Sequence, residues 1–179
     1  MMELGITIPL QKYLNTLGRH DVRHLEYGDT ADLFFCWELH RIMLQSRDTL
    51  VAVNAGNRLA VVMCGMDSGG WRNFTDLFME GLKLVLEAEG YGSGHAAAYI
   101  WNAGGVKLTK THGRRSVAGL NRMDDCLWSI PVTVNRDRMF QPVHCLEANR
   151  QSCKMAGHEG YQKPCECWER DMRLHGLLD

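Results

Sequence analysis

The chain lacks the features that would place it in a specialised class of location or partner. Its 20 Lys and Arg residues are balanced by 21 Asp and Glu residues, so the formal net charge is -1. A dedicated nucleic-acid-binding protein would carry a basic excess. No run of about 18 apolar residues is present to span a membrane, and the start MMELGITIPL lacks the pattern of a secretion signal. We therefore expect a soluble, cytoplasmic protein with no membrane partner.

Signatures of common catalytic sites are also missing. The sequence has no G-x-S-x-G, no H-E-x-x-H and no GxxxxGK[ST] loop, so it offers no recognisable nucleophile elbow, zinc-protease helix or phosphate loop. His40, His95 and His112 lie on three separate segments, and we favour a structural role over a catalytic one for each. We assign no catalytic residue and favour a protein that is not an enzyme.

The cysteine content does not indicate a disulfide framework. Seven is an odd number, and most of these thiols lie in or beside apolar segments, where cysteine packs as a small hydrophobic residue. Zinc is the alternative, because thiol and imidazole ligands gather near the C-terminus. The candidate metal ligands are Cys153, His158, Cys165 and Cys167. Since no C-x2-C pair is present, free thiols are the favoured interpretation and no cofactor is expected.

Apolar periodicity and turn residues divide the chain into segments. Residues 7–18 predict a short helix, with Pro9 in its first turn and Gly18 at its end. Residues 49–65 predict a β-hairpin around Asn-Ala-Gly-Asn. The other predicted segments are an apolar run at 33–44, a helix at 71–90, a Gly- and Ala-rich connection at 91–105, a strand at 106–111 and a helix from about Ser116 to Pro131.

This order of segments predicts an α+β fold. Helices and strands alternate too irregularly for a doubly wound parallel sheet, so we expect a largely antiparallel sheet with helices packed on one face. The periodic apolar pattern stops at Pro131. We therefore expect a core domain at 1–131 and a Cys- and His-rich appendage at 132–179, which ends in a helix.

Three motifs occur in a fixed order along the chain. They are ITIPLQKYLNTLG at residues 6–18, Trp37 before a hairpin that contains Val53 and Asn54, and RSVAGLN at residues 115–121. Over residues 3–128 this order resembles the DUF6933 family of uncharacterised bacterial domains. The family motif is one residue longer near Gly119, and it often has Asn where this chain has His40. The resemblance implies no reaction, substrate or cofactor.

The basic turn TKTHGRRS, which precedes the last motif, is the main candidate ligand site. A helix N-terminus carries free N–H groups and partial positive charge, so adjacent arginines are unfavourable unless an anion joins them. The candidate anion ligands are Lys110, His112, Arg114, Arg115 and Ser116. The favoured alternative is structural, with Arg115 paired to an Asp or Glu of the same chain, for example from residues 37–40, and Ser116 as the helix N-cap.

Two functional hypotheses follow from the sequence. The first is a small binding or regulatory protein that acts on a protein partner, for example as an inhibitor or a mobile-element accessory protein. The second is a phosphate, nucleotide or nucleic-acid binder, or an enzyme acting on such a ligand, that uses the basic residues at 110–122. Steep weakening by salt distinguishes the second from the first, because contacts to phosphate are screened by ions.

Overall fold

A computed structural model of the chain describes residues 1–155 and 160–179. Its centre is a five-stranded sheet of order β4-β3-β2-β1-β5, and the α+β prediction is confirmed. β3 pairs antiparallel with both β2 and β4, whereas β1 pairs parallel with both β2 and β5. The strands are β1 Met2–Ile6, β2 Cys36–Leu44, β3 Arg47–Asn54, β4 Ala60–Cys64 and β5 Val106–Lys110.

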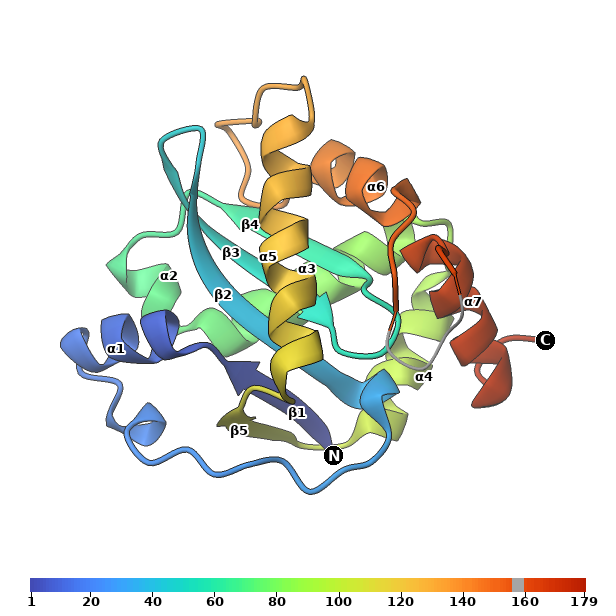
Figure 1. The fold of residues 1–179 in the computed structure, drawn as a ribbon, viewed down its shortest axis with the longest axis horizontal. Coiled ribbons are helices and arrows are strands. Elements are labelled where there is room, and N and C mark those ends of the chain that lie inside the picture. Colours follow the sequence, from blue (N-terminus) through green and yellow to red (C-terminus); the bar gives the residue numbers. More distant parts are fainter. Residues whose placement is uncertain (156–159) are drawn as a thin grey trace.

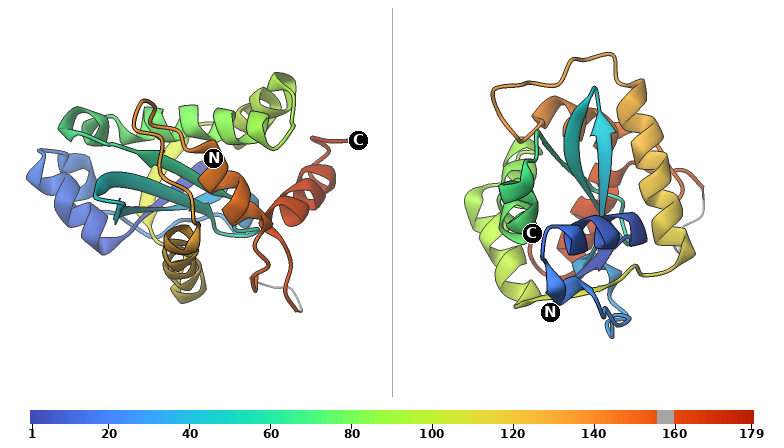
Figure 2. Two further views of the ribbon diagram at one scale, coloured as in Figure 1. Left: turned by 90° about the horizontal axis from the view of Figure 1, so that it is seen from above. Right: turned by 90° about the vertical axis from the view of Figure 1, so that its left-hand side faces the viewer.

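Helices lie on both faces of this sheet (Figures 1 and 2). α3 and α4 cover one face and α5 crosses the other, whereas the sequence pattern predicted helices on one face. The difference follows from the strands, because every residue of β4 is buried and a strand that is apolar on both sides requires cover on both sides. The helices are α1 Ile8–Thr16, α2 Ser68–Arg72, α3 Phe74–Ala88, α4 Ser93–Ala103, α5 Arg114–Ser129, α6 Pro142–Arg150 and α7 Pro164–Leu174, with short 3-10 turns η1 His20–Val22 and η2 Leu33–Phe35.

Several predicted segments are confirmed. The helix predicted at residues 7–18 is α1, which has Pro9 in its first turn and is followed by Gly18 in the left-handed region at φ 84°. The predicted hairpin is β3–β4, and the predicted strand at 106–111 is β5. Turn residues and Pro therefore marked the correct boundaries in these segments.

Two helices correct the sequence interpretation. The segment predicted as a Gly- and Ala-rich connection contains α4, whose alanines are strong helix formers and whose Tyr99 side chain is fully buried. α6 was not predicted, because its apolar residues are few. It buries Cys145 and Ala148 nonetheless.

The C-terminal segment, expected as an appendage, contributes side chains to the same hydrophobic core as the sheet. Trp168 on α7 is 0% exposed and packs against Phe34, Trp37 and Tyr99, with ring centroids 4.9–5.9 Å apart. Two hydrogen bonds order this group, because Trp37 Nε1 donates to the Tyr99 hydroxyl and that hydroxyl donates to the Phe34 carbonyl. α7 is therefore held by aromatic packing at one end of the sheet.

Within the described ranges, no helix combines the length and the apolar character needed to cross a membrane.

Candidate functional site

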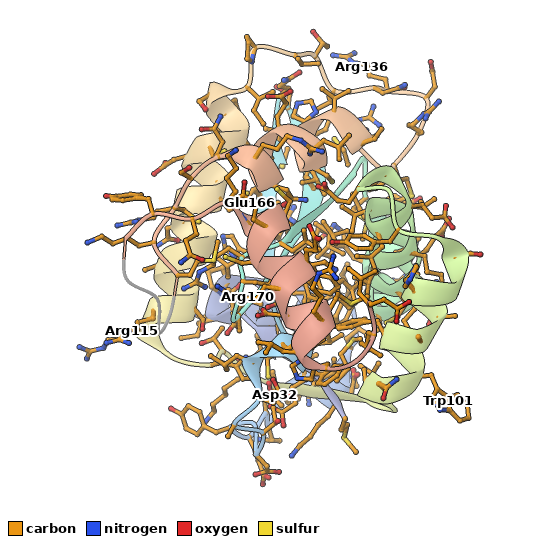
Figure 3. The ribbon with its side chains drawn as sticks, turned by 90° about the vertical axis from the view of Figure 1, so that its right-hand side faces the viewer. Asp32, Trp101, Arg115, Arg136, Glu166 and Arg170 are labelled. Atoms are coloured by element: carbon orange, nitrogen blue, oxygen red, sulfur yellow. The ribbon has the colours of Figure 1, made fainter. Side chains whose placement is uncertain are left out.

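The residues of the basic turn do not converge on one point. Lys110, Arg114 and Arg115 are exposed, and Figure 3 shows Arg115 projecting away from the body of the protein. Lys110 lies over the ring of Tyr27, with its Nζ 4.6 Å from the ring centroid. Ser116 and the side chain of His112 are instead buried beneath α5. The three cationic side chains of the turn therefore lie at the surface, whereas its His and Ser side chains lie in the interior.

The structural interpretation of Arg115 and Ser116 is corrected in both details. α5 begins at Arg114, with Gly113 at the N-cap in a left-handed conformation at φ 102°, which glycine adopts without strain. Ser116 therefore lies inside the first turn and is not the N-cap. Among residues 1–155 and 160–179, no carboxylate forms an ion pair with Arg115.

His112, just before α5, sits between two buried glutamates. Its Nδ1 is 2.9 Å from Glu38 Oε1, and its Nε2 is 3.0 Å from Glu3 Oε2. The backbone N–H of His112 also donates to Glu38 Oε1 at 2.7 Å. The side chains of Glu3, Glu38 and His112 are 4%, 0% and 7% exposed. The histidine thereby anchors the start of α5 to β1 and β2.

The charges of this cluster follow from its hydrogen bonds. Burial disfavours the imidazolium, but hydrogen bonds to Cys36 and Glu38 outweigh burial and raise the pKa of His112 to about 10. Burial likewise opposes ionisation of Glu3, yet the backbone N–H of Asp29 and the His112 side chain lower the pKa of Glu3. At neutral pH the cluster thus holds a protonated histidine against an ionised Glu3.

Arg58 forms a second polar centre under the same helix. It follows the β3–β4 turn at φ 68° and is only 5% exposed. Its Nη2 donates to the Arg115 carbonyl at 2.8 Å, and its Nη1 lies 3.5 Å from the Ser116 carbonyl. Burial lowers the pKa of the guanidinium, while the nearby Cys153 and Glu38 oppose that shift and the Arg122 cation adds to it. Arginine stays charged even so.

A pocket of about 50 Å³ opens beside Arg58. Since roughly 10–15 Å³ holds one water, this volume holds about four waters. Its described lining carries three cationic side chains and no carboxylate. The lining residues are Arg58, Gly119, Arg122, Met123, Cys126, Ala148, Gln151, Cys153, Lys154 and Pro164.

Gly119 makes the approach of Arg58 to α5 feasible. A Cβ at Gly119 would lie 2.8 Å from Arg58 Nε and still closer to two other guanidinium atoms. We expect Gly119→Ala to lower the free energy of unfolding by about 1–3 kcal/mol through overpacking and loss of the carbonyl hydrogen bonds. Urea denaturation measures the change.

Gly94→Ala on α4 is the matched control. An added Cβ at Gly94 meets no atom within 4 Å, so alanine should stabilise by up to about 1 kcal/mol through helix propensity. If Gly119→Ala raises the free energy of unfolding as much as Gly94→Ala does, Arg58 moves aside freely, and its contact with α5 does not contribute to stability.

A third polar group involves His40. Its Nδ1 lies 2.8 Å from the Thr7 hydroxyl, and burial lowers the pKa of His40 while Asp124 opposes that shift. Both His40 and Thr7 line a pocket of about 210 Å³ between α1 and α5. His112 and His40 thus lie on the same covered face, while His95 lies on α4.

The proposed zinc ligands near the C-terminus are only partly described. His158 lies outside the described residues, so its position relative to the thiols is not defined. Cys167 is buried and its Sγ donates to Gln162 Oε1 at 2.9 Å, whereas Cys153 and Cys165 are half-buried. In the described parts of the chain, the set of at least three close metal donors is Glu3, Cys36 and His112.

Sequence reasoning missed Glu3 and Arg58, and it suggested the carboxylate of residues 37–40, which is Glu38, as a partner of Arg115 and not of His112. A signal was present for the two glutamates, because each interrupts an apolar strand, in MELGI and in CWELHRIML. A carboxylate at such a position is rarely buried without a partner. Arg58 gave no signal, since an arginine after a hairpin turn is ordinarily solvated.

Comparison with known proteins places the chain in a family without assigning an activity. The profile described as "Domain of unknown function (DUF6933)" matches residues 4–167, which extends past α6 into α7 and beyond the residues on which the sequence resemblance rests. No curated protein and no solved structure matches the chain significantly. The match covers most of the sheet, α5, Glu38, His112 and Arg58 but not Glu3, and the chain therefore belongs to the DUF6933 family of domains of unknown function.

Proposed function

We propose that this protein is a binding protein that captures an oxyanion, a phosphate or carboxylate group carried by its ligand, in the pocket beside Arg58. The observation that carries the proposal is the burial of the Arg58 cation without a carboxylate at ion-pair distance in the described chain. A buried charge is unfavourable unless it is paired. An incoming oxyanion provides that pair.

The arrangement of cations supports this choice of ligand. Arg58 is held rigidly by two backbone carbonyls, while Arg122 and Lys154 reach the pocket from exposed positions. Arginine presents a planar fork that binds phosphate or carboxylate through two parallel hydrogen bonds. A buried arginine with two exposed cations at the rim favours an anion over a neutral or cationic ligand.

This proposal changes the residues assigned to the anion hypothesis. Arg114, Arg115 and Lys110 are exposed and do not line the pocket, so we propose that they contribute at most long-range attraction, which salt screens. Arg122 lies within the basic stretch 110–122 and is the one arginine of that stretch that lines the pocket. Binding to a protein or nucleic-acid partner stays a prediction. The exposed side chain of Trp101 marks a different surface (Figure 3).

Titration of inorganic phosphate and of citrate at constant ionic strength tests the proposal. We expect saturable binding at one site by calorimetry, with a rise in melting temperature because the anion binds the folded state. Arg122→Gln should weaken binding by tenfold or more, since a charge-assisted hydrogen bond contributes about 1.5–3 kcal/mol. Comparison of the two anions distinguishes phosphate from carboxylate recognition.

Arg136→Gln is the matched control, because Arg136 is exposed on the loop before α6 and does not line the pocket. It removes the same charge without removing a pocket residue. Equal weakening by Arg122→Gln and Arg136→Gln would show that only the overall charge matters, and the proposal would then be wrong.

A further inference from the structure

Three metal-binding side chains meet on the face of the sheet that α5 covers. The donor atoms of Glu3, Cys36 and His112 all lie within 4.8 Å of one another. The strand register explains why, because Glu3 on β1 is the partner of Cys36 on β2 and paired residues share a face. His112 then folds back over them from the turn before α5. The donor set is one thiol, one imidazole and one carboxylate.

A second observation points to a cation at this place. Glu38 lies two residues after Cys36 and is 0% exposed, yet its Oε2 has no hydrogen-bond partner in the described parts of the chain. His112 occupies only the other oxygen, Oε1. An unpaired carboxylate oxygen in the interior is costly, and two buried glutamates face a single histidine. A bound cation would give this buried oxygen a partner.

We propose that Glu3, Cys36 and His112 bind one divalent transition-metal ion, with zinc as the expected metal. Thiolate and imidazole ligands select zinc or cobalt, whereas magnesium and calcium require a shell made of oxygen atoms. His112 binds the ion through Nε2, the nitrogen that faces Glu3. Its Nδ1–H keeps the hydrogen bond to Glu38, which orients the ring as outer carboxylates do in zinc sites.

This site differs from the C-terminal thiols that the sequence suggested. It is buried under a helix, and it ties β1, β2 and the start of α5 together. It also uses neither Arg58 nor the pocket lined by Arg122. The metal proposal and the anion proposal therefore succeed or fail separately.

Metal loading of the full chain tests the inference. Metal-free protein titrated with Zn²⁺ against a chromophoric chelator should bind one equivalent. Cys36→Ser should weaken binding by more than about 100-fold, because the loss of a residue that only supports a ligand weakens metal binding by about 10- to 100-fold. With Co²⁺ the wild type should show a thiolate-to-metal absorption band, which Cys36→Ser should lack. Circular dichroism reports whether each variant is folded.

The double variant Cys153→Ser/Cys165→Ser is the control, because it removes the two half-buried C-terminal thiols. It should retain zinc with unchanged affinity. If it loses zinc while Cys36→Ser retains it, the inference is overturned. X-ray absorption spectroscopy of the zinc-loaded wild type tests the site without any variant, so its result does not depend on whether a variant folds. One sulfur at about 2.3 Å supports the site, whereas two or more sulfurs, or no bound zinc, contradict it.

Discussion

Replacing Trp168 with alanine is expected to lower the free energy of unfolding by about 3–5 kcal/mol, the range for a fully buried aromatic side chain. The indole is 0% exposed and contacts the rings of Phe34, Trp37 and Tyr99, which come from two other parts of the chain. Its removal leaves a cavity at the end of the sheet, and urea denaturation followed by circular dichroism measures the loss.

Trp101→Ala is the matched control, since that side chain is 86% exposed on α4. Its stability should change by less than about 0.5 kcal/mol. The result for Trp168→Ala also shows whether residues 132–179 are a separate appendage or part of the core domain. If Trp168→Ala releases α7 alone and leaves the unfolding of the sheet unchanged, the segment is a separate appendage, as the sequence suggested.

His112→Ala is expected to lower the free energy of unfolding by about 3–5 kcal/mol in protein kept metal-free with a chelator. Removing one partner of a buried charge cluster leaves the other charges unpaired. Glu3 and Glu38 would then be buried without the imidazolium that bridges them. The first turn of α5 would also lose its anchor to β1 and β2.

The same cluster predicts how stability depends on pH in the metal-free protein. The pKa of His112 is raised from 6.5 to about 10, so its contribution is complete below pH 6.5 and is lost as pH rises toward 10. The slope is about 1.4 kcal/mol per pH unit for one proton. The pKa of Glu3 is lowered from 4.5, so its contribution is lost as pH falls below 4.5. The cluster is therefore most stabilising between pH 4.5 and 6.5.

Urea denaturation from pH 4 to 10 measures this profile, with His24→Ala as the control because His24 is exposed. The control should keep the loss of stability above pH 6.5, and His112→Ala should lack it. A wild-type stability that rises from pH 7 to 9 would contradict the charges assigned to the cluster.

The sequence predicted the elements whose boundaries are marked locally. Pro9 and Gly18 bracket α1, and Asn-Ala-Gly-Asn lies at the β3–β4 turn. The parallel pairing of β1 with β2 and β5 was not predictable, because it joins strands that are distant in the chain and carries no local signal. α4 was missed for another reason: glycines at both of its ends outweighed the alanines between them.

The polar centres were not predictable from the sequence for the same reason, because their residues are distant from one another in the chain. His112 was identified as a candidate from the turn, but its partners Glu3 and Glu38 lie 109 and 74 residues away. The Cys36 thiol joins them only because β1 and β2 are in parallel register. Gly119 was part of a recognised motif, yet the reason for a glycine inside a helix is visible only once Arg58 lies against it. Local sequence predicts which residues are unusual, and tertiary structure determines what they contact.

The most direct measurement of anion capture follows the side-chain Nε–Hε signal of Arg58 by NMR during a phosphate titration at fixed ionic strength. Arg58→Lys assigns the signal. The signals of Arg58 and Arg122 should shift together and saturate with one dissociation constant, while that of exposed Arg136 stays unchanged. An unmoved Arg58 signal, or arginine signals that all drift without saturation, would show that the buried cation has a structural role only and that the pocket binds no anion.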